Sequence, residues 1–374
     1  MAIIGINARN ILPKKMEGFG HYSFEITKRI CESHAEHEFV LFFDRKVDST
    51  LKFPENVKTV VLFPPTRHPF LWLLWFDFSL PLALRKHKID LFWSPDGFCS
   101  LFTLKPQIIT IHDINFEHYP KDMPWLVQKY FRFFFPKFAK KANKILTVSN
   151  YSKADLVKTY GISNKKISVV YNAPNEIYQP ISEAEIEKTK MKYTSGKDYF
   201  LFVGSIHPRK NVQRLIYGFA KAKHELKELK FVIVGSAMWK DKLLSIPKEI
   251  EQDVVFLGHL KIEELAKVTA SAFALTYVPY FEGFGIPLVE AMKCGVPILA
   301  ADATCLPEVA GDAAIYCDPF DINSITNNMI ELFNNKQLRQ ELALNGLKRS
   351  EIFHWNLSAE KIWDTLNKLI VNNY

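Results

Sequence analysis

One stretch, from Tyr280 to Ala300, constrains the fold of this chain more than any other, and it reads YFEGFGIPLVEAMKCGVPILA. The apolar run before it, residues 272–277, is short and bounded in the manner of a buried strand. Gly283 and Gly285 follow, and glycine lets a backbone adopt positive φ or approach a ligand closely. A buried strand therefore leads into a glycine turn.

The same stretch continues into a helix. Pro287 suits the first helical turn, where its missing N–H costs no hydrogen bond, and Gly295 suits the position after the last turn. A second apolar run, 297–300, then indicates another strand. Strand, glycine turn, helix and strand together predict part of an α/β fold with a parallel sheet.

Two carboxylates frame the start of this helix, Glu282 in the turn and Glu290 about one turn into the helix. A helix N-terminus that follows a glycine turn offers free N–H groups and the positive end of a dipole, which suits a phosphate. Carboxylates instead accept hydrogen bonds from the vicinal hydroxyls of a sugar. The pattern suggests a ligand with a sugar, a phosphate and a second sugar. The alternative is an ordinary strand–helix unit whose two glutamates are solvated.

The spacing of Glu282 and Glu290 is similar to the Glu-x7-Glu signature of retaining glycosyltransferases. The segments EGFGIPLVEAMKCGVPILA and LPEVAGDAA resemble glycosyltransferase family 4, which has the GT-B fold. This resemblance implies that Glu282 holds hydroxyls of the donor sugar, that the glycine turn abuts the diphosphate and that Glu290 binds the ribose. It extends donor binding to four residues of the turn and helix start: Gly283, Phe284, Gly285 and Ile286.

Short apolar runs alternate with helical stretches along most of the chain, which predicts parallel sheets with helices on both faces. The runs are 3–6, 39–43, 57–62, 89–93, 108–111, 145–148, 167–170, 199–203, 231–235 and 254–258. A length of 374 residues favours two domains. The resemblance implies an α/β protein with two Rossmann-like domains that face a cleft, and a last helix that crosses back to the first domain. We expect an N-terminal acceptor-side domain at 1–172, a linker at 173–197, a nucleotide-sugar-binding domain at 198–352 and the crossover helix at 353–374.

The first predicted strand leads through Asn7-Ala8-Arg9 to a loop that contains Gly18 and Gly20, before a helix that ends near Ile30. Open α/β sheets bind ligands at strand-to-helix connections of this kind. The compact GxGxxG spacing of a dinucleotide site is absent. The resemblance makes Gly18 and Gly20 candidates for shaping the acceptor and diphosphate region, and a plain helix entry is the alternative.

His112 and Asp113 follow the apolar run 108–111, so the fold would place them at the carboxyl end of a strand, where open sheets bind ligands. A histidine there can accept a proton or donate a hydrogen bond to a sugar, and Asp113 can fix its tautomer. The resemblance implies that His112 contacts the donor sugar near the acceptor. A structural histidine is the alternative, and His118 is a weaker candidate nearby.

The segment GSIHPRKN, residues 204–211, follows a predicted strand, and Asn211 suits the N-cap of the next helix. Arg209 and Lys210 then lie between strand end and helix start, where they can neutralise a diphosphate. The segment resembles the family step in which an Arg and a Lys stabilise the departing nucleoside diphosphate, and Gly204 becomes a donor-binding candidate. An exposed basic pair without a ligand is the alternative.

The net charge of +8 and the pI near 9.0 favour anionic partners. Two segments, 68–88 and 125–144, combine aromatic rings with Lys and Arg, which suits the surface of an anionic membrane. The alternative is a pair of core-facing helices with solvated basic edges. Nucleic acid is not an expected partner, because no recognition module accompanies the charge.

The five cysteines form neither CxxC pairs nor an even framework, which favours reduced thiols in a cytoplasm. The N-terminus, MAIIGINARN, lacks the features of a signal peptide, and no apolar run reaches the ~18 residues that span a bilayer. We expect a cytoplasmic enzyme, with peripheral association at the inner face of the plasma membrane as a further option. Because the sequence lacks an Asp-x-Asp step, we expect neither a metal nor a cofactor beyond the nucleotide-sugar substrate.

By resemblance, the acceptor attacks on the face of the leaving group, a phosphate oxygen takes its proton and the anomeric configuration is retained. The segments GINAR, HD and PEVAGDAA are similar to those of bacterial mannosyltransferases that build surface polysaccharides. This similarity favours GDP-mannose as the donor and a glycan or lipid-linked acceptor in polysaccharide or lipopolysaccharide synthesis. A UDP-sugar donor is an alternative. Two other classes share the fold, a GT-B epimerase of nucleotide sugars and an inactive assembly partner.

Overall fold

The computed structural model describes residues 1–13, 18–236 and 244–371. The chain divides into two compact units, of which the first is Met1–Asn172 with Trp355–Tyr374 and the second is Ala173–His354. Residues 372–374, at the end of the predicted crossover helix, lie outside the described residues.

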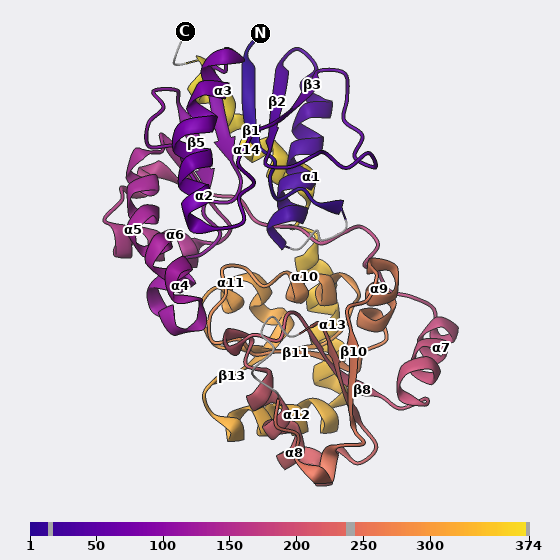
Figure 1. Ribbon diagram of the computed structural model, residues 1–374. Coiled ribbons are helices and arrows are strands. Elements are labelled where there is room, and N and C mark those ends of the chain that lie inside the picture. Colours follow the sequence, from indigo (N-terminus) through magenta and orange to yellow (C-terminus); the bar gives the residue numbers. More distant parts are fainter. Residues whose placement is uncertain (14–17, 237–243, 372–374) are drawn as a thin grey trace. The chain divides into compact units, whose positions relative to one another are not determined.

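The first unit is built on a sheet of seven parallel strands in the order β3-β2-β1-β4-β5-β6-β7 (Figure 1). The strands are β1 (Ile3–Asn7), β2 (Glu38–Phe43), β3 (Val57–Val61), β4 (Leu91–Ser94), β5 (Gln107–Thr110), β6 (Lys144–Thr147) and β7 (Ile167–Val169). Every residue of β4 and β5 is buried, as expected for parallel strands covered on both faces. The strand order reverses between β1 and β4, and open sheets bind ligands at such a switch point.

Helices cover both faces of this sheet, because parallel strands need crossover connections. They are α1 (Gly18–Ser33), α2 (Pro69–Leu74), the π-helix η2 (Trp75–Ser79), α3 (Leu80–Lys86), α4 (Asn115–His118), the 3₁₀ turn η3 (Pro120–Asp122), α5 (Trp125–Lys141), α6 (Asn150–Tyr160), the 3₁₀ turn η4 (Asn164–Lys166) and α14 (Trp355–Val371). None of the helices in the described part of the chain is both long enough and apolar enough to span a bilayer.

The last helix, α14, belongs to the first unit, as predicted for a crossover helix. Trp363 stacks on His34 of α1 with the ring centroids 3.7 Å apart. The Ser358 hydroxyl donates to the carbonyl of Tyr171 at 2.6 Å. Figure 1 shows this yellow helix beside the indigo elements of the first unit.

The second unit is built on six parallel strands in the order β10-β9-β8-β11-β12-β13. They are β8 (Tyr199–Val203), β9 (Lys230–Val234), β10 (Val254–Gly258), β11 (Ala274–Tyr277), β12 (Ile298–Ala301) and β13 (Ala314–Cys317). The order reverses between β8 and β11, which makes this pair the second switch point. Strand β13 was not predicted, although its four residues, AIYC, form a short apolar run, and it pairs in parallel with β12. The predicted α/β class with two parallel sheets is confirmed.

The helices of the second unit connect these strands. They are α7 (Glu183–Thr194), the 3₁₀ turn η5 (Pro208–Lys210), α8 (Val212–Leu226), the 3₁₀ turn η6 (Lys248–Ile250), α9 (Ile262–Ala270), α10 (Ile286–Lys293), α11 (Leu306–Ala310), the 3₁₀ turn η7 (Gly311–Ala313), α12 (Ile322–Asn334) and α13 (Lys336–Ser350). The segment 173–197, expected to be a linker, lies in this unit. Its helix α7 is held to α9 by an ion pair between Glu185 and Lys267 at 2.9 Å.

Candidate functional site

The connection from β11 to α10 has the form that the glycine pattern predicted. Gly285 is the N-cap of α10 with φ of 88°, a left-handed conformation that favours glycine. A Cβ at this position would lie 2.8 Å from the Leu306 side chain. Both backbone and space therefore require glycine here, and Ile286 begins the helix directly after it.

Glu282, in the turn before Gly285, is buried with 7% of its surface exposed. Its Oε1 lies 2.5 Å from Nη1 of Arg209, and Nζ of Lys210 contacts the same oxygen. Arg209 also donates to the carbonyl of Phe281 at 3.2 Å. The structure therefore brings together three of the predicted catalytic residues.

Charge decides the protonation state of this cluster. Burial alone would raise the pKa of Glu282, but the charges of Arg209 and Lys210 outweigh that effect and hold the pKa below its ordinary value. Tyr277 of β11 contributes as well, because its hydroxyl lies 2.5 Å from Nζ of Lys210. Burial raises the pKa of Tyr277 well above its ordinary value, so this phenol is neutral. Two cations and one carboxylate leave a surplus of one positive charge.

The backbone of η5 holds Arg209 and Lys210 in place. His207 is the N-cap of η5 and its ring accepts the N–H of Arg209 at 3.3 Å. The carbonyl of Arg209 in turn accepts the N–H of Tyr280 at 3.0 Å. This bond ties the loop after β8 to the loop after β11, which explains how residues far apart in sequence meet.

Asn211 occupies the N-cap position of α8, as predicted, but its side chain does not cap the helix. Its amide nitrogen instead donates to the carbonyls of Val278 at 2.9 Å and Pro319 at 2.7 Å. The backbone adopts φ of 62°, which asparagine tolerates better than most residues. Asn211 is therefore a buried brace between the loops that carry the cluster.

Two glycines let the ends of β8 and β9 approach each other. Gly204 has φ of 147° and donates its N–H to Val234 at 2.9 Å. A Cβ on Gly235 would lie only 1.9 Å from the Gly204 carbonyl oxygen, so no other residue fits there. The sequence analysis took Gly235 only as the end of a strand. The tripeptide Val-Gly-Ser occurs at both 203–205 and 234–236, and this repeat could have indicated that the two strand ends have similar roles.

Glu290, the second residue of the Glu-x7-Glu pattern, lies on α10. Burial raises the pKa of Glu290 to about 7, although a hydrogen bond from Tyr178 lowers it in part. Tyr178 is 1% exposed, and sequence reasoning missed it because it falls in the segment expected to be a linker. Near neutral pH the Glu290 carboxyl is therefore present in both its protonated and its ionised form.

Phe284, between the two glycines of the turn, is buried and packs edge-on against Phe353 with ring centroids 5.7 Å apart. Gly283 is buried beside it. The sulfhydryl of Cys305 donates to the carbonyl of Glu282 at 3.2 Å. The turn is thus fixed from several sides, which preorganises its backbone N–H groups.

His112 lies at the carboxyl end of β5 in the first unit and is 9% exposed. Its Nε2–H donates to the carbonyl of Pro95 at 2.9 Å, because a carbonyl can only accept. Burial lowers the pKa of His112 to about 4, so the ring is neutral and Nδ1 is an acceptor. The expectation that Asp113 fixes the tautomer is wrong, because the carbonyl of Pro95 does so. Asp113 instead accepts the N–H of Asn115 at 3.1 Å through Oδ1.

Gly18 and Gly20 lie in the first turn of α1, whereas we expected them in a loop before the helix. The ring of Phe19, between them, meets His112 edge-on with centroids 4.7 Å apart. A Cβ on Gly18 would meet no atom within 4 Å. Open space therefore surrounds the Cβ position of Gly18, and the helix begins earlier than the glycine content suggested.

The two aromatic and basic segments, 68–88 and 125–144, contribute mainly to the core of the first unit. Trp75, Phe76 and Phe138 are fully buried. One face of α5 differs, since Trp125 is 71% exposed. A cavity of about 510 Å³ opens beside it, lined by Glu117, Gln128, Lys129, Arg132, Phe133, Pro136, Lys140, Thr159 and Tyr160.

The predicted site residues fall into two groups, with Gly18, Gly20, His112 and Asp113 in the first unit and the others in the second. Within residues 1–13, 18–236 and 244–371, no three His, Cys, Asp or Glu side chains gather as a metal site would require.

Comparisons with known proteins follow the two units. Residues 18–175 match the family described as Glycosyltransferase Family 4, and residues 183–349 match Glycosyl transferases group 1. The chain is 33% identical over 261 residues to the O-antigen chain mannosyltransferase RfbU of Salmonella typhimurium, an alignment that covers 67% of this chain and 68% of that protein. The chain belongs to glycosyltransferase family 4.

A second relative matches over nearly the whole length. It is the O-antigen chain mannosyltransferase B of Escherichia coli, 28% identical over 359 residues, which cover 91% of this chain and 93% of that protein. These relatives establish the present family 4 protein as an enzyme that transfers glycosyl groups.

Solved structures agree on the fold. Sucrose-phosphate synthase from Thermosynechococcus elongatus superposes with a TM-score of 0.79 over 100% of both chains at 17% identity. Anabaena Alr3699/HepE in complex with UDP and glucose gives 0.77 over 98% of this chain and 100% of that chain at 18% identity. The family 4 enzyme therefore has the GT-B fold.

Proposed function

We propose that this glycosyltransferase moves mannose from GDP-mannose to a glycan or lipid-linked acceptor in the synthesis of a surface polysaccharide or lipopolysaccharide. The mannosyl donor is supported by the two O-antigen mannosyltransferases, one of which aligns with 91% of the chain. A third relative, the MMP alpha-(1->4)-mannosyltransferase of Mycolicibacterium hassiacum, is 28% identical over 240 residues. The UDP-bound neighbour is 18% identical, a level at which only the fold carries over, so UDP-sugars are the second candidate.

The observation that carries the proposal is the cluster of Arg209, Lys210 and Glu282. It lies at the carboxyl ends of β8 and β11, the switch point of the second sheet, where open α/β sheets bind ligands. Its surplus positive charge adjoins the N-terminus of α10, where the positive end of the helix dipole favours an anion. A diphosphate leaving group needs both features.

In the proposed reaction, a bond forms between the acceptor oxygen and the anomeric carbon while the bond from that carbon to the phosphate oxygen breaks. The electron pair leaves with the diphosphate, where Arg209, Lys210 and the start of α10 stabilise the charge without a metal. The acceptor proton passes to a phosphate oxygen. Because attack and departure share one face, the anomeric configuration is retained.

Other residues of the second unit position the donor. Glu282 accepts hydrogen bonds from hydroxyls of the donor sugar, and Glu290 in its ionised form accepts them from the ribose. The backbone of the glycine-bearing positions lies against the diphosphate, where side chains would block the approach. The glycines are Gly204, Gly283 and Gly285, and the backbone of Phe284 and Ile286 belongs to the same turn and helix start.

In the first unit, His112 would bind a hydroxyl of the donor sugar. Its Nε2–H is engaged by Pro95, so Nδ1 can accept a hydroxyl proton but the neutral ring has no second N–H to donate. Asp113 supports the loop by accepting the N–H of Asn115. Gly18, with open space at its Cβ position, and Gly20 would shape the acceptor and diphosphate region on either side of Phe19.

Thermal unfolding with GDP, UDP and ADP in turn, with a chelator present, tests the donor. A ligand at ~100 times its dissociation constant stabilises a protein by about 2.7 kcal/mol. A rise in Tm with GDP alone would support the proposal, whereas a rise with UDP alone would assign a UDP-sugar. No rise with any nucleotide would favour an inactive assembly partner, and a changed sugar nucleotide formed without acceptor would identify an epimerase.

A further inference from the structure

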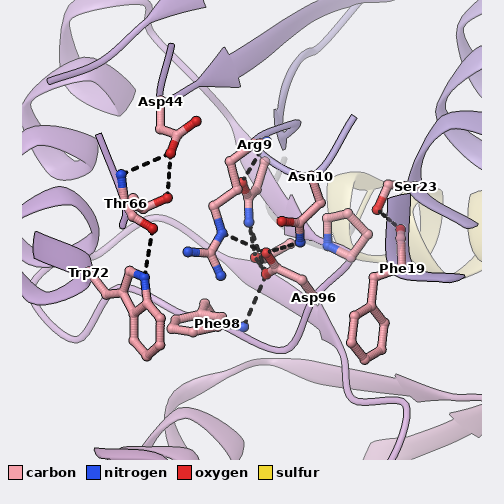
Figure 2. A network of polar contacts seen from close by, with 12 residues as sticks. Arg9, Asn10, Phe19, Ser23, Asp44, Thr66, Trp72, Asp96 and Phe98 are labelled. Carbon is pink, nitrogen blue, oxygen red and sulfur yellow. Dashed lines mark hydrogen bonds and ion pairs between the residues drawn. The ribbon is translucent and has the colours of Figure 1, made fainter. Parts of the chain in front are cut away.

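A second network of polar side chains lies at the switch point of the first sheet, away from the cluster already described. Strands β1 and β4 are neighbours there, with Ile6 opposite Trp93. Their carboxyl ends carry Asn7, Arg9 and Asp96, and both Asn7 and Arg9 donate to the Asp96 carboxylate. Figure 2 shows Arg9 and Asn10 pointing toward this carboxylate.

The carboxylate of Asp96 has no capacity left for further donors. Its Oδ1 accepts hydrogen bonds from the amide of Asn7 at 2.9 Å, from the hydroxyl of Ser94 at 3.0 Å and from the N–H of Phe98 at 3.4 Å. Its Oδ2 accepts from Nε of Arg9 at 2.7 Å and from the amide of Asn10 at 2.9 Å. Five donors exceed the roughly four lone-pair positions of a carboxylate.

Arg9 is consequently only partly satisfied. Only its Nε donates to Asp96, and the Arg9 side chain is 7% exposed. Its two amino nitrogens, Nη1 and Nη2, have no hydrogen-bond partner among the residues that the structure describes. Figure 2 shows them on the side of the guanidinium that faces away from Asp96. The guanidinium carbon lies 4.0 Å from the ring centroid of Phe98 and 5.0 Å from that of Phe76, so rings cover its face and its amino edge stays open.

Arg45, just after the neighbouring strand β2, forms an ion pair with Asp44 that has only a structural role and serves as a comparison. Its Nε and Nη2 bind the two oxygens of Asp44 at 2.6 and 2.8 Å, a bidentate pair that is worth more than a single contact. Asp44 can accept both because its other donors come only from Thr66. Arg9 has no such arrangement, since Asp96 is already saturated.

The Arg9 side chain is 7% exposed, so water or a ligand can supply the acceptors that its two amino nitrogens do not find among the described residues. The two amino nitrogens of Arg9 can only donate hydrogen bonds, so they suit a group whose atoms only accept them. The planar guanidinium also matches the spacing of two oxygens in a carboxylate or phosphate. We propose that the amino edge of Arg9 binds an oxyanion, a phosphate or carboxylate group, carried by the acceptor substrate.

This inference rests on the proposed function for the source of the oxyanion. The diphosphate of the donor has its own cations in Arg209 and Lys210 of the second unit. Arg9 belongs to the first unit, which we expect to be the acceptor-side domain. The proposal therefore narrows the acceptor to one that carries a phosphate or carboxylate group.

The oxyanion site is tested first without any transfer assay, by titrating full-length protein with inorganic phosphate and, in parallel, with acetate. Both titrations use a Lys210→Ala background, which weakens the other anion-attracting cluster, and sodium chloride keeps the ionic strength constant. We expect Arg9→Lys to weaken the apparent affinity for one of these anions at least about tenfold, because the fork is lost while the charge is kept. The matched control, Arg45→Lys, should change it less than about twofold. Equal affinities in the Arg9 and Arg45 variants would overturn the proposal.

A measurement on the unaltered protein covers the case in which Arg9→Lys fails to fold. Crystals soaked with selenate should show its anomalous signal within hydrogen-bond distance of Nη1 or Nη2 of Arg9, about 3 Å. Selenate bound at Arg209 and Lys210 but absent from Arg9 would contradict the inference.

The source of the oxyanion is tested by steady-state kinetics. In Arg9→Lys, the acceptor KM should rise at least about tenfold while kcat and the dissociation constant of GDP stay within about twofold. Weaker GDP binding with an unchanged acceptor KM would assign Arg9 to the donor and refute the acceptor proposal. If the unaltered protein transfers no sugar from any donor, the proposed function fails, whereas the phosphate and acetate titrations still decide whether Arg9 binds an oxyanion.

Discussion

Arg209 and Glu282 are 73 positions apart in the sequence, yet Nη1 of one lies 2.5 Å from Oε1 of the other. Lys210 contacts the same oxygen, and the carboxylate is 7% exposed. A buried carboxylate held by two cations is preorganised, because neither the charge nor its partners need to rearrange when a diphosphate arrives.

Replacing Lys210 with alanine should reduce glycosyl transfer at least ~100-fold, since one preorganised contact to the leaving group is lost. The fold should persist, because Arg209 still neutralises Glu282. Glu282→Ala should lower transfer by a similar factor. Initial rates with saturating donor and acceptor, together with circular dichroism, measure both effects.

Lys223→Ala is the matched control for that experiment. Lys223 also pairs with a carboxylate in the second unit, Asp253 at 3.0 Å, but it lies in the last turn of α8. Its removal should leave transfer close to the unaltered rate. Near-normal transfer in the Lys210 and Glu282 variants would refute the role of the cluster.

Glu290 should make stability depend on pH in a defined direction. Its pKa is raised from 4.5 to about 7 in the folded protein, so the folded state keeps a proton that the unfolded state releases. The contribution of Glu290 to the free energy of unfolding is therefore fully present below pH 4.5, and it is lost as the pH rises through about 7. Glu290→Gln removes this loss, so its stability relative to the unaltered protein should increase over that interval.

Urea unfolding at pH 5, 6, 7 and 8 measures the difference. Glu331→Gln, which alters an exposed glutamate of α12, serves as the control and should show no such trend. The same titration predicts weaker GDP binding as pH falls below about 7, because protonated Glu290 accepts fewer hydrogen bonds. A pH-independent difference between Glu290→Gln and the unaltered protein would show that the carboxyl is ionised throughout.

Gly235→Ala should be severely destabilising. Its Cβ would lie 1.9 Å from the Gly204 carbonyl oxygen, so β8 and β9 would have to separate. Gly161→Ala is the control, because Gly161 also has positive φ, 64°, but open space around it, and should cost only about 1–2 kcal/mol. Thermal unfolding of the Gly235→Ala and Gly161→Ala variants measures the difference. Similar Tm values would show that the ends of β8 and β9 can move apart to accommodate the added Cβ.

We propose that the exposed face of α5 contacts an anionic membrane, which would bring the enzyme to the inner face of the plasma membrane. Trp125 is 71% and Phe133 is 58% exposed, and Phe133 lines a cavity together with Lys129, Arg132 and Lys140. Exposed aromatic rings with basic side chains suit a charged lipid surface. The protein should therefore sediment with vesicles that contain phosphatidylglycerol.

Vesicles of phosphatidylcholine alone are the control for lipid charge. Replacing both Lys129 and Lys140 with glutamate should reduce sedimentation with the anionic vesicles, whereas the same change at Lys188 and Lys192 of α7 should not. Negligible binding to both kinds of vesicle would leave these segments with a purely structural role.

The sequence by itself determined the local units and their chemistry. The glycines and proline of the stretch 280–300 predicted the turn and α10, because positive φ and a missing N–H are properties of single residues. The alternation of apolar runs with helical stretches predicted two parallel sheets. Strand β13 escaped prediction although its residues form a short apolar run, and its place beside β12 came from the structure.

The tertiary structure alone decided which groups meet and which are left without partners. Tyr178 binds Glu290, and the carbonyl of Pro95 fixes the tautomer of His112. Five donors occupy the Asp96 carboxylate, so it accepts only Nε of Arg9. Periodicity and spacing cannot show these contacts, because they join residues from different elements. Burial then sets the pKa of Glu290 and of His112, and burial is a property of the packed chain rather than of any segment of it.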